Sequence, residues 1–179
     1  MKLIKNTTAE KLRGGFYTPE PIAAFILKWG INGSSDYEIL EPSCGDGVFL
    51  EQLKENNHKF NSVTAIEFDE IEAKKSDKIK LNNKTVINTD FHLYCNETTS
   101  RFDLVVGNPP YIRYQYFQEE QQNEAIKLFN RAKLKYSKLT NAWVSFVVGS
   151  SLLLKRIGKI GFVIPAELLQ VSYAQQLRE

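Results

Sequence analysis

The sequence predicts an α/β fold, a mostly parallel Rossmann-like sheet with helices on both faces, from two observations. Short apolar runs typical of buried strands alternate along the chain with segments of helical periodicity. The first of these runs leads into a glycine turn and then a helix, which is the first half of a βαβ unit. Because strands that alternate with helices form right-handed parallel sheets, we expect one domain over residues 1–179.

The first strong helix start follows a polar N-terminal stretch, in which Thr7 and Glu10 have the spacing of a capping box. Thr18 is a good N-cap, and Pro19 suits the first helical position. The helix should present an apolar face made by four residues at helical spacing: Ile22, Phe25, Ile26 and Trp29.

Five strands are expected, at residues 37–40, 63–66, 84–87, 102–107 and 159–164. Helices should follow the glycine turn from Val48 and occupy 70–80, 142–155 and, after Pro165, 166–179. We interpret 88–91 as the exit of the third strand and 112–140 as a polar insertion of amphipathic character. The chain stops within its last helix without a cap, which we interpret as a truncation.

The composition is that of an ordinary globular protein, with 42% hydrophobic and 25% charged residues. No apolar run approaches the ~20 residues that span a bilayer, and Met1 opens no signal-peptide pattern, so we expect no membrane partner. Two cysteines, Cys44 and Cys95, make no disulfide framework and favour a cytoplasmic location. Two distant histidines without a Cys/His cluster predict no metal site.

Positive charge is concentrated in the insertion. The whole chain has a net charge of +2, whereas residues 112–140 alone carry +3. The basic residues there are Arg113, Lys127, Arg131, Lys133, Lys135 and Lys138. A solvated helix face and a phosphate-facing surface both explain this excess.

The glycine turn favours a cationic ligand over a dinucleotide. Gly45 and Gly47 follow a strand, but the third glycine of a dinucleotide fingerprint is replaced by Leu50. Glu41 and Asp46 flank the turn, and their charge opposes the pyrophosphate that such a helix start would hold. S-adenosylmethionine (SAM) carries an ammonium, a sulfonium and no phosphate, so it suits this turn.

Two further strands end in acidic residues beside aromatic ones. Glu67 lies 20 residues beyond Gly47, the separation at which an acid reaches ribose hydroxyls. Asp90 ends the third strand and could accept from an adenine amino group, with Phe68 or Phe91 against the ring. Each acid alone is equally well an ordinary loop residue. Three strands that each deliver one to the same edge predict a binding site.

Asn108-Pro109-Pro110-Tyr111 leaves the fourth strand. Two prolines end the strand and stiffen the backbone, which leaves an amide side chain, a fixed carbonyl and an exposed aromatic ring at a strand's C-terminal end. Open α/β sheets place their ligand crevices there. By itself the tetrapeptide could also be a rigid exit without chemistry.

The order of these motifs resembles the gamma-class N6-adenine DNA methyltransferases of type II restriction–modification systems. The motifs that carry the resemblance are Phe16-Tyr17-Thr18-Pro19, Glu41 to Gly47, Glu67, Asp90-Phe91 and Asn108 to Tyr111. The resemblance implies a SAM-dependent methyltransferase fold. It also implies a cofactor site at Tyr17, Thr18, Glu41, Ser43, Gly45, Asp46, Gly47, Glu67, Phe68, Asp90, Phe91 and Asn108.

The catalytic residues implied by the resemblance are Asn108, Pro109, Pro110 and Tyr111. The Asn108 side chain and the Pro109 carbonyl would accept the protons of an adenine amino group. The adenine would be flipped out of double-stranded DNA and stacked on Tyr111. Phe146 matches an aromatic near the target or cofactor, and a core role explains it equally well.

The chain departs from that family in two respects, because two further sheet strands and a target-recognition domain are absent. Three alternatives therefore stay open. The chain could methylate the side-chain amide nitrogen of a protein glutamine, or the exocyclic N4 atom of cytosine. It could also be a fragment that binds SAM or DNA without turnover.

Overall fold

The strands form one parallel sheet of order β3-β2-β1-β4-β5 in the part of the chain that the structure describes. The computed structural model describes residues 18–32, 36–113, 116–137 and 141–166. The strands are β1 (Glu38–Glu41), β2 (Ser62–Glu67), β3 (Lys84–Asn88), β4 (Phe102–Gly107) and β5 (Leu154–Phe162). The predicted α/β class, with its parallel sheet, is confirmed.

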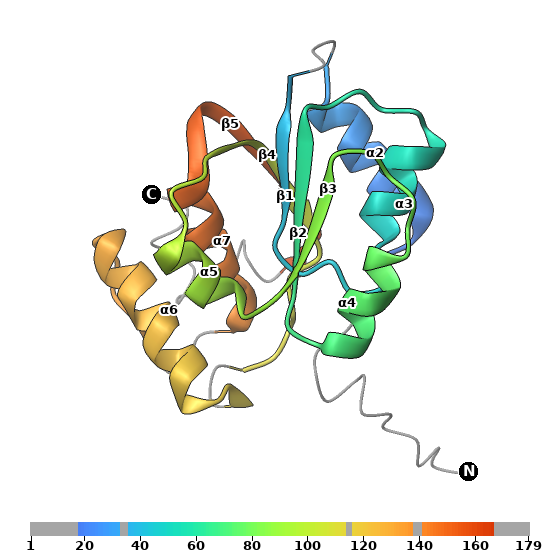
Figure 1. Ribbon diagram of the computed structural model, residues 1–179. Helices are drawn as coiled ribbons and strands as arrows, with labels where there is room; N and C mark the ends of the chain where they lie inside the picture. Colours follow the sequence, from blue (N-terminus) through green and yellow to red (C-terminus); the bar gives the residue numbers. More distant parts are fainter. Residues whose placement is uncertain (1–17, 33–35, 114–115, 138–140, 167–179) are drawn as a thin grey trace, which may run out of the picture.

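Helices cover both faces of this sheet (Figure 1). One layer holds α2 (Glu20–Gly30), α3 (Val48–Glu55) and α4 (Glu70–Asp77). The opposite layer holds α5 (Phe91–Glu97), α6 (Glu119–Arg131) and α7 (Ala142–Leu153). No helix within the described ranges is long and apolar enough to cross a membrane.

The central strands supply both hydrophobic cores. In β1, Ile39 belongs to the core under α2 and α3, and its neighbour Leu40 belongs to the core under α5 to α7. In β4, Leu104 and Val105 divide in the same way. Successive side chains of a strand point to opposite faces, so a strand covered on both sides must be apolar throughout.

The start of α2 differs from the prediction made for Thr18 and Pro19. The structure has Pro19 as the N-cap, and no side chain caps the helix. The Pro19 carbonyl instead accepts from the main-chain N–H groups of Ile22 and Ala23. Thr18 is buried and lies one position before the cap. Its buried hydroxyl side chain is therefore part of the adjoining cavity rather than of the helix start.

The predicted apolar face of α2 is confirmed only for Ile26, which packs against the core under α2 and α3. The helix packs through Ala23, Leu27 and Gly30, whereas Phe25 is 70% exposed and Trp29 51% exposed. A Cβ atom added to Gly30 would lie 2.7 Å from the side chain of Leu104, so the helix approaches the sheet closely. Small residues permit that approach. The residues that pack have the same helical spacing as the larger residues that were expected to pack, so spacing alone does not distinguish the two faces.

Helix α5 was not predicted from the sequence, and it carries Cys95. The Asp90 side chain caps the helix by accepting from the main-chain N–H groups of His92 (2.9 Å) and Leu93 (3.1 Å). Cys95 is fully buried in the core under α5 to α7. The acid at the end of the third strand is therefore also a helix cap.

The last strand begins earlier than expected. Helix α7 ends at Leu153 and β5 begins at once at Leu154, five residues before the predicted start. The pairing of Phe102 with Leu154 and then of Leu104 with Lys159 shows an irregular register, which absorbs the extra residues. The helix expected over 166–179, beyond its first residue, and the capping box at Thr7 and Glu10 lie outside the described residues.

Candidate active site

A cavity of about 630 Å³ opens at the C-terminal edge of the sheet. Residues at the ends of four strands line it: Glu41 from β1, Glu67 from β2, Asp90 after β3 and Asn108 after β4. Parallel strands end at the same edge, which is why side chains up to 67 positions apart meet there. The convergence predicted from the strand ends is present.

Most of the predicted site residues line this cavity. They are Thr18, Glu41, Ser43, Gly45, Asp46, Glu67, Phe68, Asp90, Phe91, Asn108 and Pro110. Gly47, Pro109 and Tyr111 are not among the lining residues. Tyr17 lies outside the described residues.

The glycine turn adopts a backbone that requires glycine. Gly45 has φ +53° and Gly47 has φ +95°, both in the left-handed region. A Cβ atom on Gly47 would lie 2.4 Å from Cδ1 of Ile79, whereas one on Gly45 would meet nothing within 4 Å. Gly47 therefore permits the close packing of α3 against the end of α4, and Gly45 opens its backbone to the cavity.

Three acids around the turn lie in an environment that disfavours their charge. Burial, followed by the charges of Glu67 and Asp46, raises the pKa of Glu41 well above its ordinary value. Burial also raises the pKa of Glu67 and, with the charge of Glu72, that of Asp46. Glu41 is 1% exposed, and its Oε2 atom has no hydrogen-bond partner among the described residues. A cationic group in the cavity would relieve this cost, so the residues fit the ammonium of SAM.

Glu67 holds the glycine turn against the exit of β2. Its Oε2 accepts from the main-chain N–H of Gly45 at 2.8 Å, and its Oε1 accepts from that of Asp69 at 2.8 Å. Asp69 in turn caps α4. Each carboxylate oxygen has a second lone pair, so Glu67 can still accept from a ligand hydroxyl.

Asn108 is held from two sides. The Ser43 hydroxyl donates to its main-chain carbonyl at 3.3 Å. The hydroxyl of Tyr111 contacts its side chain and also the main-chain carbonyl of Val163, at 2.6 Å. Tyr111 was expected to be exposed, but its ring is half-buried against the core under α5 to α7. Burial raises the pKa of Tyr111 to about 12, so the hydroxyl keeps its proton.

Aromatic rings form one wall of the cavity. Phe91 is buried and stacks on Phe146, with ring centroids 4.8 Å apart. Phe68 is 56% exposed at the rim. Phe146 belongs to the core under α5 to α7 and also lines the cavity.

Sequence reasoning missed the residues that the insertion contributes. Ile112 and Phe117 line the cavity from the connection between β4 and α6, Gln121 lines it from the first turn of α6, and His92 lines it from α5. The sequence signal for His92 was its position two residues after Asp90, the acid at the end of the third strand. For the others the sequence offered only the length of the insertion, because nothing local shows where a long connection folds back.

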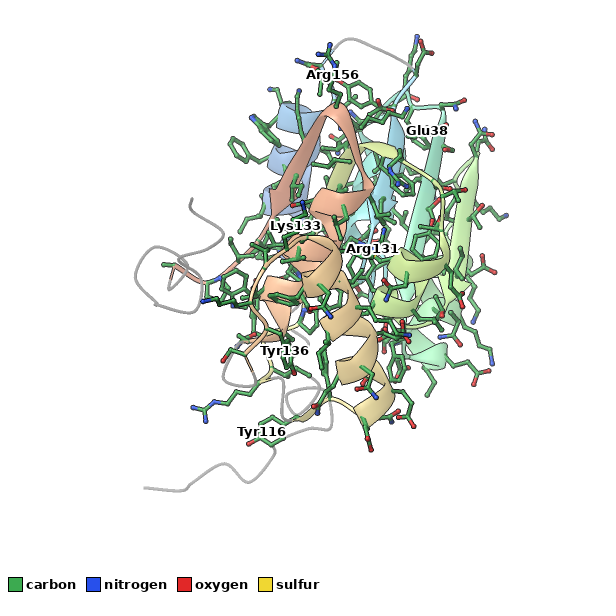
Figure 2. The ribbon with its side chains drawn as sticks, turned by 90° about the vertical axis from the view of Figure 1, so that its left-hand side faces the viewer. Glu38, Tyr116, Arg131, Lys133, Tyr136 and Arg156 are labelled. Carbon is green, nitrogen blue, oxygen red and sulfur yellow. The ribbon has the colours of Figure 1, made fainter. Side chains whose placement is uncertain are left out.

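The basic excess of the insertion is spread over different environments. Arg131 donates to the carbonyl of Cys95 (2.9 Å) and to Oδ1 of Asn96 (3.0 Å) at the end of α5. Lys127 pairs with Glu124, and Lys133 is exposed. Figure 2 shows Arg131 and Lys133 at the opposite end of α6 from Tyr116, which lies at the cavity. A helix of 13 residues is about 20 Å long, so these two cations lie far from the cavity.

A solved structure has the same fold. A protein from Listeria monocytogenes described as a class I SAM-dependent methyltransferase superposes with a TM-score of 0.70 at 16% identity. The match covers 97% of this chain and 52% of that protein. At this identity the likeness concerns the fold alone. The described sheet order and the cavity at its C-terminal edge agree with it.

Curated relatives are methyltransferases of two kinds. The type II methyltransferase M.HincII of Haemophilus influenzae is 30% identical over 93% of this chain and 30% of its own length. The tRNA1(Val) (adenine(37)-N6)-methyltransferase of the same species is 28% identical over 72% of this chain and 53% of its own length. This chain thus spans about a third of the type II enzymes that it matches.

The family comparison covers all of the described residues. The Eco57I restriction-modification methylase family matches residues 18–179, from the first cavity residue onward. Family and fold together support SAM as the cofactor. The chain belongs to the Eco57I restriction-modification methylase family.

Proposed function

We propose that this chain binds SAM and transfers its methyl group to the N6 amino group of an adenine flipped out of double-stranded DNA. One observation carries the proposal: Asn108 lines the same cavity as the buried Glu41 and the partly buried Glu67 and Asp90. An amide acceptor for a nitrogen nucleophile and a set of acids for a cationic cofactor thus share one site.

The acids have separate roles in this proposal. The orphaned Glu41 Oε2 would pair with the cofactor's ammonium, because it is buried without another partner among the described residues. Glu67 would accept from the ribose hydroxyls, and Asp90 from the adenine amino group. Phe91 and Phe68 would flank the adenine ring. SAM supplies a methyl group on a positively charged sulfur, which a neutral nitrogen can attack.

Asn108 would activate the target nitrogen. The lone pair of an adenine amino group is delocalised into the ring, so the nitrogen is a poor nucleophile. When the Asn108 side-chain oxygen and the Pro109 carbonyl accept its two protons, the lone pair is localised and directed toward the methyl group. The two acceptors would also stabilise the positive charge that develops on nitrogen, without a strong base. As the bond to nitrogen forms, the bond between the methyl carbon and sulfur breaks and S-adenosylhomocysteine leaves, and the methylated nitrogen then loses one proton to water.

The substrate assignment rests on the relatives. M.HincII and M.AccI are named type II methyltransferases, which favours DNA, and the tRNA1(Val) relative is named for N6 of adenine, which favours that atom. The same relative makes RNA the second candidate substrate. Because the chain spans about 30% of the type II enzymes, we infer that a target-recognition domain belongs to the whole protein. A cytoplasmic location is part of the proposal, since both cysteines are free and buried.

The first test is calorimetric titration of the 179-residue chain with SAM. We expect micromolar binding, at least tenfold weaker in Glu67→Ala. Glu51→Ala is the matched control, because Glu51 is an exposed glutamate outside the cavity. Circular dichroism checks that each variant is folded. A folded chain that binds no SAM would contradict the proposed cofactor site.

The second test identifies the methylated atom. Duplex DNA is incubated with methyl-labelled SAM and hydrolysed to nucleosides, and N6-methyladenine is the expected product. If the methylated product is instead N4-methylcytosine, a tRNA or a protein glutamine, the proposed substrate is wrong and that product identifies the substrate. Asn108→Ala should abolish the product and leave SAM affinity unchanged. Loss of both together would assign Asn108 a structural role instead.

A further inference from the structure

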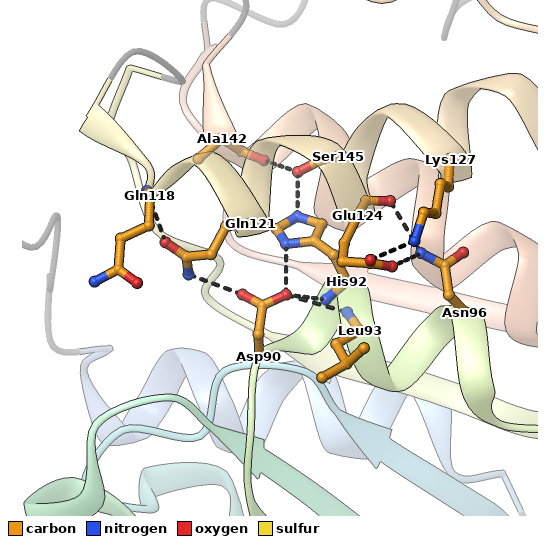
Figure 3. A network of polar contacts seen from close by, with 10 residues as sticks. All are labelled: Asp90, His92, Leu93, Asn96, Gln118, Gln121, Glu124, Lys127, Ala142 and Ser145. Atoms are coloured by element: carbon orange, nitrogen blue, oxygen red, sulfur yellow. Dashed lines mark hydrogen bonds and ion pairs between the residues drawn. The ribbon is translucent and has the colours of Figure 1, made fainter.

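A buried chain of polar contacts runs behind Asp90, from α5 to α7 (Figure 3). Nδ1 of His92 lies 3.2 Å from Oδ1 of Asp90, and Nε2 of His92 lies 2.7 Å from the hydroxyl of Ser145. The Ser145 hydroxyl is also 2.8 Å from the carbonyl of Ala142 in the first turn of α7. His92 and Ser145 are both 0% exposed. Two residues on neighbouring helices thus support one carboxylate of the cavity.

The two oxygens of Asp90 have different surroundings. Oδ1 accepts from the main-chain N–H groups of His92 and Leu93, and the His92 ring approaches it as well. Oδ2 accepts from Nε2 of Gln121 at 2.8 Å, and Gln121 lines the cavity. Oδ1 is therefore surrounded by donors from α5. Oδ2, which has one donor and two lone pairs, is the oxygen that can accept from a ligand.

The contacts of His92 determine which proton faces Asp90. A carboxylate only accepts, so Nδ1 must carry a proton for its contact with Oδ1 to be a hydrogen bond. Nε2 then either accepts the Ser145 proton or donates to the Ser145 oxygen, whose proton goes to Ala142. In both cases Nδ1–H points at Asp90. The rings of Phe146 and Phe117, with centroids 5.2 Å and 5.6 Å from that of His92, prevent the imidazole from turning.

Asp90 is ionised in this environment. Burial raises its pKa, but the hydrogen bond and charge of His92, together with the hydrogen bond from Gln121, outweigh that effect and lower the pKa below the ordinary value. An ionised carboxylate accepts strongly from an amino group and repels a carbonyl oxygen at the same place. The charge held on Asp90 can therefore discriminate between purines that differ at position 6.

We propose that His92 and Ser145 are positioning residues that hold Asp90 so that the cavity selects a 6-aminopurine over a 6-oxopurine in its nucleoside ligand. The inference rests on the proposed function, in which Asp90 accepts from the adenine of the cofactor. It adds that selectivity depends on two fully buried residues, His92 of α5, which lines the cavity, and Ser145 of α7, which does not.

The test compares S-adenosylhomocysteine with S-inosylhomocysteine, which has an oxo group at position 6 and a proton on N1, by calorimetric titration of the 179-residue chain. We expect the wild type to bind the adenosyl compound about 10- to 100-fold more tightly, the range for a hydrogen bond to a charged group. His92→Phe keeps the aromatic packing but removes the Nδ1 donor. It should reduce the ratio of the two affinities, adenosyl over inosyl, at least fivefold, because it weakens the binding of the adenosyl compound only.

His92→Asn is the matched variant, because its amide nitrogen can take the place of Nδ1 while the contact with Ser145 is lost. Because it lacks the support of Ser145, it should restore the affinity ratio only in part, to a value between those of His92→Phe and the wild type. Ser145→Ala, which removes the support of Nε2, should give an intermediate ratio. A merely structural role for His92 would weaken both ligands by the same factor in His92→Phe, and that result would overturn the inference.

The remaining outcomes separate this inference from the proposed function. Equal affinity of the wild type for the two ligands would overturn the inference and leave the cofactor site standing. Failure of the folded wild type to bind either ligand would overturn the proposed cofactor site and the inference with it. Equal ratios in His92→Phe and His92→Asn would show that the Nδ1 donor does not set selectivity.

Discussion

The hydroxyl of Tyr111 contacts the side-chain amide of Asn108, three residues before it, and also the main-chain carbonyl of Val163. A phenol carries one proton, and a main-chain carbonyl can only accept it. The contact with the phenol is made by Oδ1 of Asn108, so it fixes the rotation of this amide and leaves the second lone pair of Oδ1 to accept from a target amino group, as the proposed role requires.

Removing that hydroxyl should impair methyl transfer without affecting cofactor binding. Tyr111→Phe keeps the ring in the core but frees the Asn108 amide to rotate. We expect the rate of methyl transfer to fall about 10- to 100-fold, the size of a lost orienting contact at a polar site. The dissociation constant for SAM should stay unchanged, because Tyr111 does not line the cavity. An unchanged rate would exclude this orienting role.

Glu41 should make the protein less stable as pH rises. Its pKa is raised in the folded protein, so the folded state holds a proton that the unfolded chain has already lost. The folded state therefore binds more protons from the ordinary carboxyl pKa up to the raised one. Stability falls as pH increases through that window. Glu41→Gln should flatten the fall and raise the free energy of unfolding above the window by about 1–3 kcal/mol.

Urea unfolding at pH 5 and pH 8 measures this effect, with Glu51→Gln as the exposed control. The same Glu41→Gln protein should bind SAM at least tenfold more weakly, because the neutral amide cannot pair with an ammonium. Stabilisation together with weaker binding would mean that Glu41 is retained for the ligand rather than for the fold. A Glu41→Gln protein less stable than wild type at pH 8 would contradict the prediction.

The two glycines of the turn should respond differently to alanine. Both have positive φ, which costs about 1–2 kcal/mol for a residue with a side chain. Only at Gly47 does the new Cβ also collide with Ile79, which adds about 1–3 kcal/mol of overpacking. Thermal unfolding should therefore rank wild type, Gly45→Ala and Gly47→Ala in order of decreasing stability. Equal losses would show that backbone strain alone matters there.

Arg131 should contribute to stability more than its exposed neighbour. Its guanidinium bonds a carbonyl and an amide oxygen at the end of α5, so Arg131→Met should lower the free energy of unfolding by about 1–2 kcal/mol. Lys133→Gln, at an exposed position, should change it by less than about 0.5 kcal/mol. Chemical denaturation compares the two variants. Equally small effects of the two substitutions would mean that the Arg131 contacts do not stabilise the fold. Arg131 would then count as a surface cation that is available to a phosphate backbone.

Local patterns in the chain were sufficient for the sheet and for most of the cavity. A strand buried on both faces must be a short apolar run, and β4 was predicted with both its ends correct at Phe102 and Gly107. Parallel strands end at one edge, so acids predicted at the ends of β1, β2 and β3 had to meet there. Both inferences need only the chemistry of neighbouring residues and the geometry of a parallel sheet.

Packing between distant segments decided the rest. Two faces of α2 have helical spacing, and only the close approach of Gly30 to Leu104 selects the one that packs. Helix α5 exists because Asp90 caps it, and α6 reaches the cavity because Gln121 meets that same carboxylate across 31 positions. The support of Asp90 by His92 and Ser145 joins residues 53 apart. Contacts of this kind depend on how helices settle on the sheet, and no local pattern encodes that arrangement.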